Sequence, residues 1–283
     1  MQNSLNAPGK ICTLMRSVEE STLADREKTL LEQDVFVRDH ITKDDYLIVS
    51  VGGNDIALRP TPQTILYMFL LTRSPAWLIH LGIAPGFGYF VNLFGSRVAE
   101  LTARVCAKQR PKKIALCMLY YLDQNPGDGW AENTLSKLGY NADPGKLQLI
   151  IRTLFRALRK RRIGRELAGE GTCVLHVPLF TALDPRDSGN YIQRVEPSVE
   201  GGRQMAEVLL GVLLAEDSEA AIDHLLLHPP AYRNGERPKS DTDAATTWMR
   251  GLGLMMLAVV GVVVLVKGVR AATAPAPLSG ARL

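Results

Sequence analysis

The run Val51-Gly52-Gly53-Asn54-Asp55 combines residue types that can stabilise an oxyanion. Two glycines let the backbone turn sharply and approach a substrate closely, and an asparagine side chain there can donate an N–H to developing negative charge. The sequence Gly-Asn-Asp also makes ordinary turns. We take Gly53 and Asn54 as catalytic candidates, and Gly52 and Asp55 as candidates for contact with a substrate.

Other side chains suited to acid–base chemistry lie in or after later apolar runs. Asp123 directly follows one such run, and Asp184 and Asp187 lie in a Pro/Gly-containing loop after another. Turn formation explains these carboxylates as readily as chemistry does. We keep Asp123 and Asp187 as substrate-binding candidates. His176 lies inside a run, where a single histidine is more often a satisfied core residue than a ligand.

The elements that must position these residues are predicted by hydrophobic patterning. Three runs are apolar at odd and even positions alike, as expected for parallel strands that are buried on both faces. They are Tyr46 to Val51, Ile114 to Leu122 and Thr172 to Val177. Apolar stripes at helical spacing lie between and after them, at 94–105, 147–158 and 205–213. The alternation predicts an α/β fold, a three-layer α/β/α domain with a mainly parallel sheet. Such sheets bind ligands at the carboxyl ends of their strands, which is where the GGND run falls.

A further unit is indicated near the start of the chain. The short apolar run Lys10 to Met15 precedes a polar stretch with helical character, Glu19 to Gln33. Together they predict one more β-α unit of the same domain.

The order of these features resembles the SGNH (GDSL-type) hydrolases over roughly Lys10 to Leu214. A strand followed by GGND, two further β-α units, an Asp-rich loop and the helix start Pro197-Ser198 to Gly201-Gly202 carry the resemblance. It implies a flavodoxin-like SGNH fold and hydrolysis of an ester. It also implies that Asn54 donates to the oxyanion.

Two of the family's motifs are replaced in this chain. No Gly-Asp-Ser block precedes GGND, and Arg16 to Glu20 stands where the second-block glycine would fall. Gln193-Arg194-Val195-Glu196-Pro197 replaces the Asp-x-x-His block, which leaves Glu196 as a divergent base. The central strand that carries the nucleophile is missing as well. We expect either that the sequence begins inside its natural domain or that Lys10 to Met15 rearranges to fill the place.

The C-terminal part has a different character. No charge occurs from Gly251 to Val266, and basic residues flank this run, which predicts a transmembrane helix over 248–270 rather than a buried core helix. We expect an SGNH hydrolase-like domain over 1–227, a linker over 228–247 and a short tail over 271–283. The first ten residues lack an apolar signal region, so a single-pass C-terminal anchor with a cytosolic main domain is expected.

Two further segments invite a membrane interpretation. Lys146 to Arg165 carries seven arginines and lysines after Lys146 and no acidic residue, which suits either a helix C-terminus or anionic lipid headgroups. Ile65 to Phe94 is unusually apolar and is interrupted by proline and glycine. It fits ordinary core helices, a lid over an acyl chain, or a segment that dips into a bilayer surface.

Composition excludes some classes of function. A net charge of +4 gives no general case for nucleic acid as partner. The four cysteines form no CxxC pair or zinc-type cluster, so neither a metal nor a cofactor is expected. The leading hypothesis is an esterase acting on a lipid or acylated small molecule near a membrane. The alternatives are a catalytically degenerate SGNH-fold binding module tethered to a membrane, and a peripheral lipid-binding adaptor.

Overall fold

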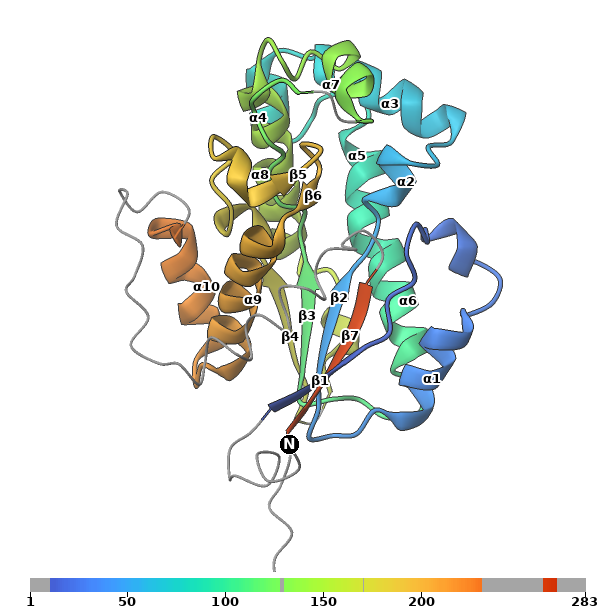
Figure 1. Ribbon diagram of the computed structural model, residues 1–283. Coiled ribbons are helices and arrows are strands. Elements are labelled where there is room, and N and C mark those ends of the chain that lie inside the picture. Colours follow the sequence, from blue (N-terminus) through green and yellow to red (C-terminus); the bar gives the residue numbers. More distant parts are fainter. Residues whose placement is uncertain (1–10, 128–129, 170, 231–261, 269–283) are drawn as a thin grey trace, which may run out of the picture.

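The computed structural model describes residues 11–127, 130–169, 171–230 and 262–268. Its centre is a five-stranded sheet with the order β1-β7-β2-β3-β4 (Figure 1). The strands are β1 (Ile11–Met15), β2 (Tyr46–Ser50), β3 (Lys113–Cys117), β4 (Cys173–Val177) and β7 (Val262–Gly268). β2, β3 and β4 are parallel neighbours, which confirms the prediction from the three apolar runs.

Burial on both faces explains why those runs are continuously apolar. Leu47, Ile48 and Val49 of β2 are all buried, as are Ile114 and Ala115 of β3. Successive side chains of a strand point to opposite faces, so both faces of this sheet are covered. The second run, Ile114 to Leu122, continues past the end of β3 without regular secondary structure and leads to the candidate site.

An inner position of the sheet is filled by β7, which pairs antiparallel with β1 on one side and β2 on the other, so the sheet is mixed rather than mainly parallel. The expectation that the run at 10–15 moves into the central place is wrong, because β1 lies at the edge of the sheet. For residues 262–268 the predicted transmembrane helix is also wrong, since they form a strand. The rest of that prediction, 248–261 and 269–270, lies outside the described residues, as do 231–247 and 271–283. Among the described helices, none has the length and apolar character needed to cross a bilayer.

Helices cover both faces of the sheet. The longer ones are α1 (Glu32–His40), α6 (Arg97–Val105), α8 (Pro144–Lys160), α9 (Val199–Leu214) and α10 (Ser218–Leu227). α1 and α6 contact each other on one side, and α9 and α10 contact each other on the other (Figure 1). The predicted stripes at 147–158 and 205–213 lie on α8 and α9. The stripe at 94–105 lies on α6 and on the π-helical turn Asn92–Ser96 before it.

The predicted helix over 19–33 is wrong for most of its length. Residues 16–31 form a loop with one 3-10 turn, Ala24–Arg26, and α1 begins only at Glu32. Hydrogen bonds to residues distant in the sequence hold this loop, as described below, and no local sequence pattern predicts them.

Further elements gather beyond the carboxyl ends of β2 and β3, at the top of Figure 1. They are α2 (Asn54–Ala57), α3 (Pro62–Arg73), α4 (Ala76–Leu81), α5 (Phe87–Val91) and α7 (Glu132–Lys137). The two-residue strands β5 (Tyr191–Ile192) and β6 (Glu196–Pro197) form a hairpin nearby. These elements surround the candidate site.

Candidate functional site

The GGND turn sits directly between β2 and α2. Gly52 has a φ of +101°, and a Cβ there would meet a ring carbon of Phe94 at 3.0 Å. Only glycine fits both constraints without strain. The turn lets α2 begin at Asn54, so the side chains of Asn54 and Asp55 start at the carboxyl edge of the sheet, as predicted.

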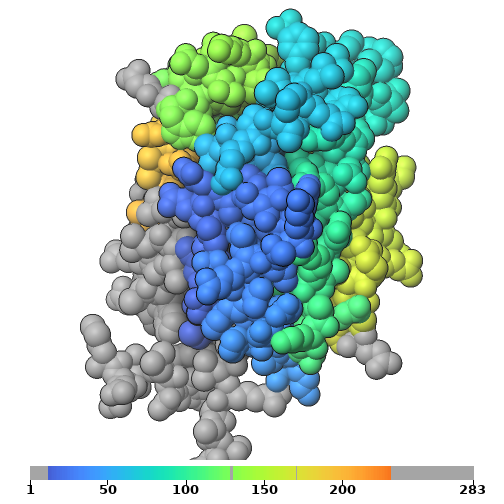
Figure 2. Space-filling model, turned by 90° about the vertical axis from the view of Figure 1, so that its right-hand side faces the viewer, coloured from blue at the N-terminus to red at the C-terminus, as the bar shows by residue number. Residues whose placement is uncertain are grey.

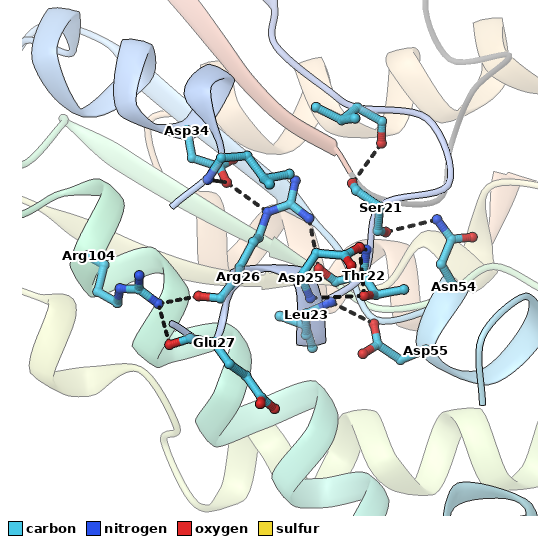
Figure 3. A network of polar contacts seen from close by, with 12 residues as sticks. Ser21, Thr22, Leu23, Asp25, Arg26, Glu27, Asp34, Asn54, Asp55 and Arg104 are labelled. Carbon is cyan, nitrogen blue, oxygen red and sulfur yellow. Dashed lines mark hydrogen bonds and ion pairs between the residues drawn. The ribbon is translucent and has the colours of Figure 1, made fainter. Parts of the chain in front are cut away.

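Asn54 and Asp55 both bind the loop that follows β1 (Figure 3). The Asn54 side chain is 1 % exposed, and its Nδ2 donates to the carbonyl oxygen of Ser21 at 3.0 Å. The Asp55 carboxylate accepts from the backbone N–H of Leu23 at 2.9 Å and of Ala24 at 3.4 Å. Burial raises the pKa of Asp55 above its ordinary value, against the opposing effect of these hydrogen bonds and of the Arg97 charge. The turn thus joins β2 to the loop after β1.

That loop is held at a second point by a buried ion pair. Arg26 Nε donates to Asp34 Oδ2 at 2.8 Å, and both side chains are almost fully buried. Arg26 Nη1 also donates to the carbonyl of Thr22 at 2.9 Å, and Arg104 donates to the carbonyl of Arg26 (Figure 3). The loop is therefore fixed both at the GGND turn and at Asp34, although none of its residues lines the cavity described next.

An apolar cavity of about 150 Å³ begins at the turn itself. Ser50, Val51 and Gly53 line it from the β2 side, and Tyr120 lines it from the segment after β3. Apolar side chains supply most of the remaining wall, among them Ile56, Met68, Met118, Leu119, Leu122 and Ile151. Gly53 thus belongs both to the candidate oxyanion turn and to the lining of the apolar cavity.

The outer wall of the cavity comes from α7 and the residues beside it. Trp130, Ala131, Leu135 and Leu138 line it, and Trp130 is also 43 % exposed, which places this side chain at the mouth. The spacing of 131, 135 and 138 is that of a helical stripe, so sequence patterning could have identified this helix. We did not predict α7 or its part in the site.

Arg194 fastens α7 to the rest of the domain. Its buried guanidinium donates to Glu132 and, at 2.9 Å, to Oδ1 of Asn141, while Nη2 donates to the carbonyl of Asp123 at 3.1 Å. The hydrogen bond from Asn141 and the contact with Arg194 help lower the pKa of Glu132 below its ordinary value. Gln193 and Arg194 both have positive φ, 49° and 71°, a conformation that costs free energy for residues with side chains. The hydrogen bonds of Arg194 offset the free-energy cost of this backbone conformation.

Asp123 and Asp187 lie in a second cluster, beside the cavity. Asp123 is buried and accepts from the backbone N–H and Nδ2 of Asn125, at 2.8 and 3.0 Å. Asn125 Nδ2 also donates to Ser188 Oγ, so it joins Asp123 to the Asp187 loop. Asp187 itself is exposed and caps a 3-10 turn by accepting from Gly189 N. Turn formation accounts for Asp187, whereas Asp123 is a buried carboxylate near the site.

Glu196 lies in the hairpin strand β6, and its neighbour Val195 lines the cavity together with Gly53. Tyr120 Oη donates to the Val195 carbonyl at 2.7 Å. Burial, and secondarily the charge of Glu196, raise the pKa of Tyr120 above its ordinary value. The hairpin is therefore at the cavity, on the opposite side from the GGND turn.

The remaining candidates have structural partners elsewhere. His176 lies on β4, where its Nε2 bonds to the carbonyl of Ile163 at 2.9 Å and burial lowers its pKa. Asp184 accepts two hydrogen bonds from the Arg186 guanidinium, which lowers the pKa of this carboxyl. No histidine is among the cavity-lining residues within the described part of the chain, nor does that part hold three grouped His, Cys, Asp or Glu side chains able to bind a metal.

Comparison with known proteins finds no matching family model, no similar curated protein and no similar solved structure.

Proposed function

We propose that this chain is an SGNH-like hydrolase that acts on the ester bond of a lipid or acylated small molecule. The observation that carries the proposal is the apolar cavity that begins at Gly53, at the carboxyl ends of the parallel strands β2 and β3. Ligands of open α/β sheets bind at this edge. An ester whose acyl chain occupies the cavity has its carbonyl next to the GGND turn.

The wall of the cavity suits a hydrocarbon chain. A dry apolar cavity of about 150 Å³ takes up ligands the size of benzene, whereas a charged group would lose its hydration there without a partner. Trp130 at the mouth and Met68 deeper in the wall can follow the shape of a flexible chain. An acyl chain is therefore the part of the substrate that this chamber recognises.

The proposed roles of the polar residues follow from their positions. Gly53 and Asn54 stabilise the oxyanion, with an expected contribution of about 3 kcal/mol per donor. Glu196 is the divergent base. Gly52, Asp55 and Asp123 fix the walls against which the substrate lies. The nucleophile is not among the residues to which we assign a role.

A second candidate is a binding module of SGNH-like fold without catalysis. Two observations favour it. The Asn54 amide donates to the Ser21 carbonyl, so at least one of its N–H groups already serves the fold. No histidine lines the cavity within the described residues, so no imidazole is at hand to activate a hydroxyl there.

Membrane attachment through the charge-free run at 251–266 is part of the proposal, although residues 262–268 form β7. Support comes from the absence of charge in the run and from its basic flanks, and a full span requires residues 262–268 to leave the sheet. L254D/L257D, which introduces two charges before β7 and keeps β7 itself, should move the protein from the membrane fraction to the supernatant. If this variant still sediments with membranes after a high-salt wash, attachment lies elsewhere.

The decisive experiment compares hydrolysis with acyl binding in the same purified protein. Rates on p-nitrophenyl esters of increasing chain length should rise with chain length, and Asn54→Ala should lower them by about 100- to 1000-fold. A fluorescent fatty acid should bind in either case. Hydrolysis by the parent that is lost in Asn54→Ala while this variant stays folded and still binds the fatty acid supports the hydrolase. Binding by the parent without hydrolysis supports the module, and neither binding nor hydrolysis overturns both.

Thr134→Trp tests whether the cavity is the binding place. Thr134 is exposed on α7 and lines the cavity, so a larger side chain there should block the fatty acid. Asn133→Trp is the matched control, because Asn133 is exposed on the same helix and does not line the cavity. Equal binding by the two variants would place the acyl chain elsewhere.

A further inference from the structure

The upper end of the molecule exposes an unusual group of large apolar side chains. Six of them are half or more exposed and belong to α3, α4 and the turn after α4; we call them the apolar cap: Ile65, Leu66, Phe69, Trp77, Leu81 and Ile83. Elsewhere in the described part of the chain, only Leu227 among the large apolar side chains is exposed to that degree. Figure 2 shows this segment in light blue and cyan at the top of the molecule.

α3 is apolar on its outer face as well as on its inner face, where Leu71 is buried, unlike an ordinary surface helix. Ile65, Leu66 and Phe69 form a stripe at helical spacing that faces solvent, whereas such stripes normally face the core. Exposed apolar surface of this extent marks a site of interaction rather than chance exposure.

The cap is a fixed platform. Thr64 Oγ1 lies 2.5 Å from Tyr89 Oη, which joins α3 to α5. Gly86 has a φ of +84°, and a Cβ there would lie 2.6 Å from the Tyr67 carbonyl oxygen, so the backbones of the two segments are in close contact. A preformed apolar platform loses little conformational entropy when it docks.

The charge around the cap identifies its partner. No aspartate or glutamate occurs between Asp55 and Glu100. Arg73, at the end of α3, stacks over the Phe69 ring at 4.7 Å, and no carboxylate of the described residues lies within ion-pair distance of it. Next to α4, His80, Arg156 and Lys160 line a separate open pocket. Apolar and aromatic side chains bordered by cations are the pattern of surfaces that insert into anionic lipid.

We propose that the apolar cap docks on an anionic lipid bilayer, with α3 and α4 inserted at the level of the headgroups and upper acyl chains. Met68 lies on the same helix as the cap and lines the cavity, and Trp130 stands at the cavity mouth. Docking therefore brings the mouth of the cavity to the lipid surface. This inference goes beyond the proposed function, because it requires docking and not ester cleavage.

Tryptophan quenching tests the proposal in the full chain. The chain has three tryptophans, so W130F/W248F leaves Trp77 of the cap as the sole fluorophore. With vesicles that contain phosphatidylserine and brominated phosphatidylcholine, Trp77 should be quenched, and less so without phosphatidylserine. Adding I65S/F69S should weaken vesicle binding of the cap by about tenfold or more, because two inserted side chains are lost.

The matched control places the fluorophore on an exposed apolar position far from the cap. Leu214 on α9 is 49 % exposed, so W77F/W130F/W248F/L214W should bind the same vesicles without quenching of its tryptophan. V199S/L214S should leave Trp77 quenching unchanged. Circular dichroism checks that every variant is folded.

Three results would overturn the inference. In the first, Trp77 is quenched no more than the tryptophan introduced by L214W. In the second, quenching persists unchanged in I65S/F69S. In the third, sedimentation shows a dimer that I65S/F69S abolishes while vesicles leave Trp77 unquenched, which would make a second copy the occupant of the cap. None of these measurements depends on ester hydrolysis. The inference can therefore be overturned while the proposed function stands, and the reverse also holds.

Discussion

The side-chain amide of Asn54 lies 3.0 Å from the backbone carbonyl of Ser21 and donates a hydrogen bond to it. Asn54 follows β2, and Ser21 follows β1, while β7 lies between those two strands. The amide therefore has a structural task that is separate from any part in catalysis, and two substitutions of similar size can measure it.

Asn54→Asp should destabilise the protein more than Asn54→Ala does at neutral pH. The alanine variant leaves a buried carbonyl without its donor, at a cost of about 1–3 kcal/mol. The aspartate variant sets a carboxylate oxygen against that carbonyl, and its excess cost should shrink as the pH is lowered and the carboxyl is protonated. Urea unfolding at several pH values measures the free energy of unfolding of both variants. Asn133→Asp, at an exposed position of α7, should change little.

Asp55 should make the stability of the protein fall as the pH rises above the ordinary range of a carboxyl. Burial raises the pKa of Asp55 in the folded chain, so between the unfolded and folded pKa values the folded state binds more protons than the unfolded state. Stability is then lost with increasing pH in that interval. Asp55→Asn lacks this titration and should gain stability relative to the parent as the pH rises above about 4. A difference in the free energy of unfolding between the two proteins that stays constant as the pH rises would contradict the prediction.

Breaking the Arg26–Asp34 pair from one side should cost about 3–5 kcal/mol, because an uncompensated charge stays buried. Asp34→Ala is the single variant, and Arg26→Met with Asp34→Leu removes both charges. The double variant should be more stable than the single one, as thermal or urea unfolding can show. As a control, Asp39→Asn breaks the exposed Arg38–Asp39 pair and should have little effect. A double variant less stable than Asp34→Ala would mean that the pair serves more than charge compensation.

Arg194→Ala should loosen α7 and thereby open the outer wall of the cavity. The guanidinium binds Glu132, Asn141 and the Asp123 carbonyl, and all three lose their donor. Backbone amides over 131–140 should exchange hydrogen about tenfold or more faster, while those of β3 stay protected. Arg186→Ala, which removes an exposed ion pair with Asp184, should leave exchange in α7 unchanged. Unchanged exchange in Arg194→Ala would show that packing alone holds this helix.

The parts of the fold that were predictable are those whose signal is local. Continuous apolar runs predicted β2, β3 and β4 as parallel neighbours, and glycine followed by Asn-Asp located the turn at the carboxyl edge. The strand β7 was not predicted, because a charge-free run satisfies the hydropathy criterion for a membrane helix as well as that for a buried strand. Periodicity alone does not separate the two.

The candidate site was predictable only on the β2 side. Asn54 and Asp55 were found from residue type and spacing, but their partners Ser21 and Leu23 lie more than thirty positions away in the sequence. Arg194 gave no signal, because an arginine in a loop is ordinarily solvated. Its buried position depends on Glu132 and Asn141, which belong to a distant segment.

The placement of β7 has a consequence for how the chain reaches its folded state. β1 and β2 are both neighbours of β7 and not of each other, although they lie within residues 11–50 while β7 lies at 262–268. Pairing between segments so distant along the chain is slow, since the entropy of closing the loop is lost before the contacts form. During synthesis, β1 and β2 therefore emerge long before their shared partner and present open strand edges in the meantime. Such edges recruit strands from other chains, so a nascent chain halted before residue 262 is expected to aggregate.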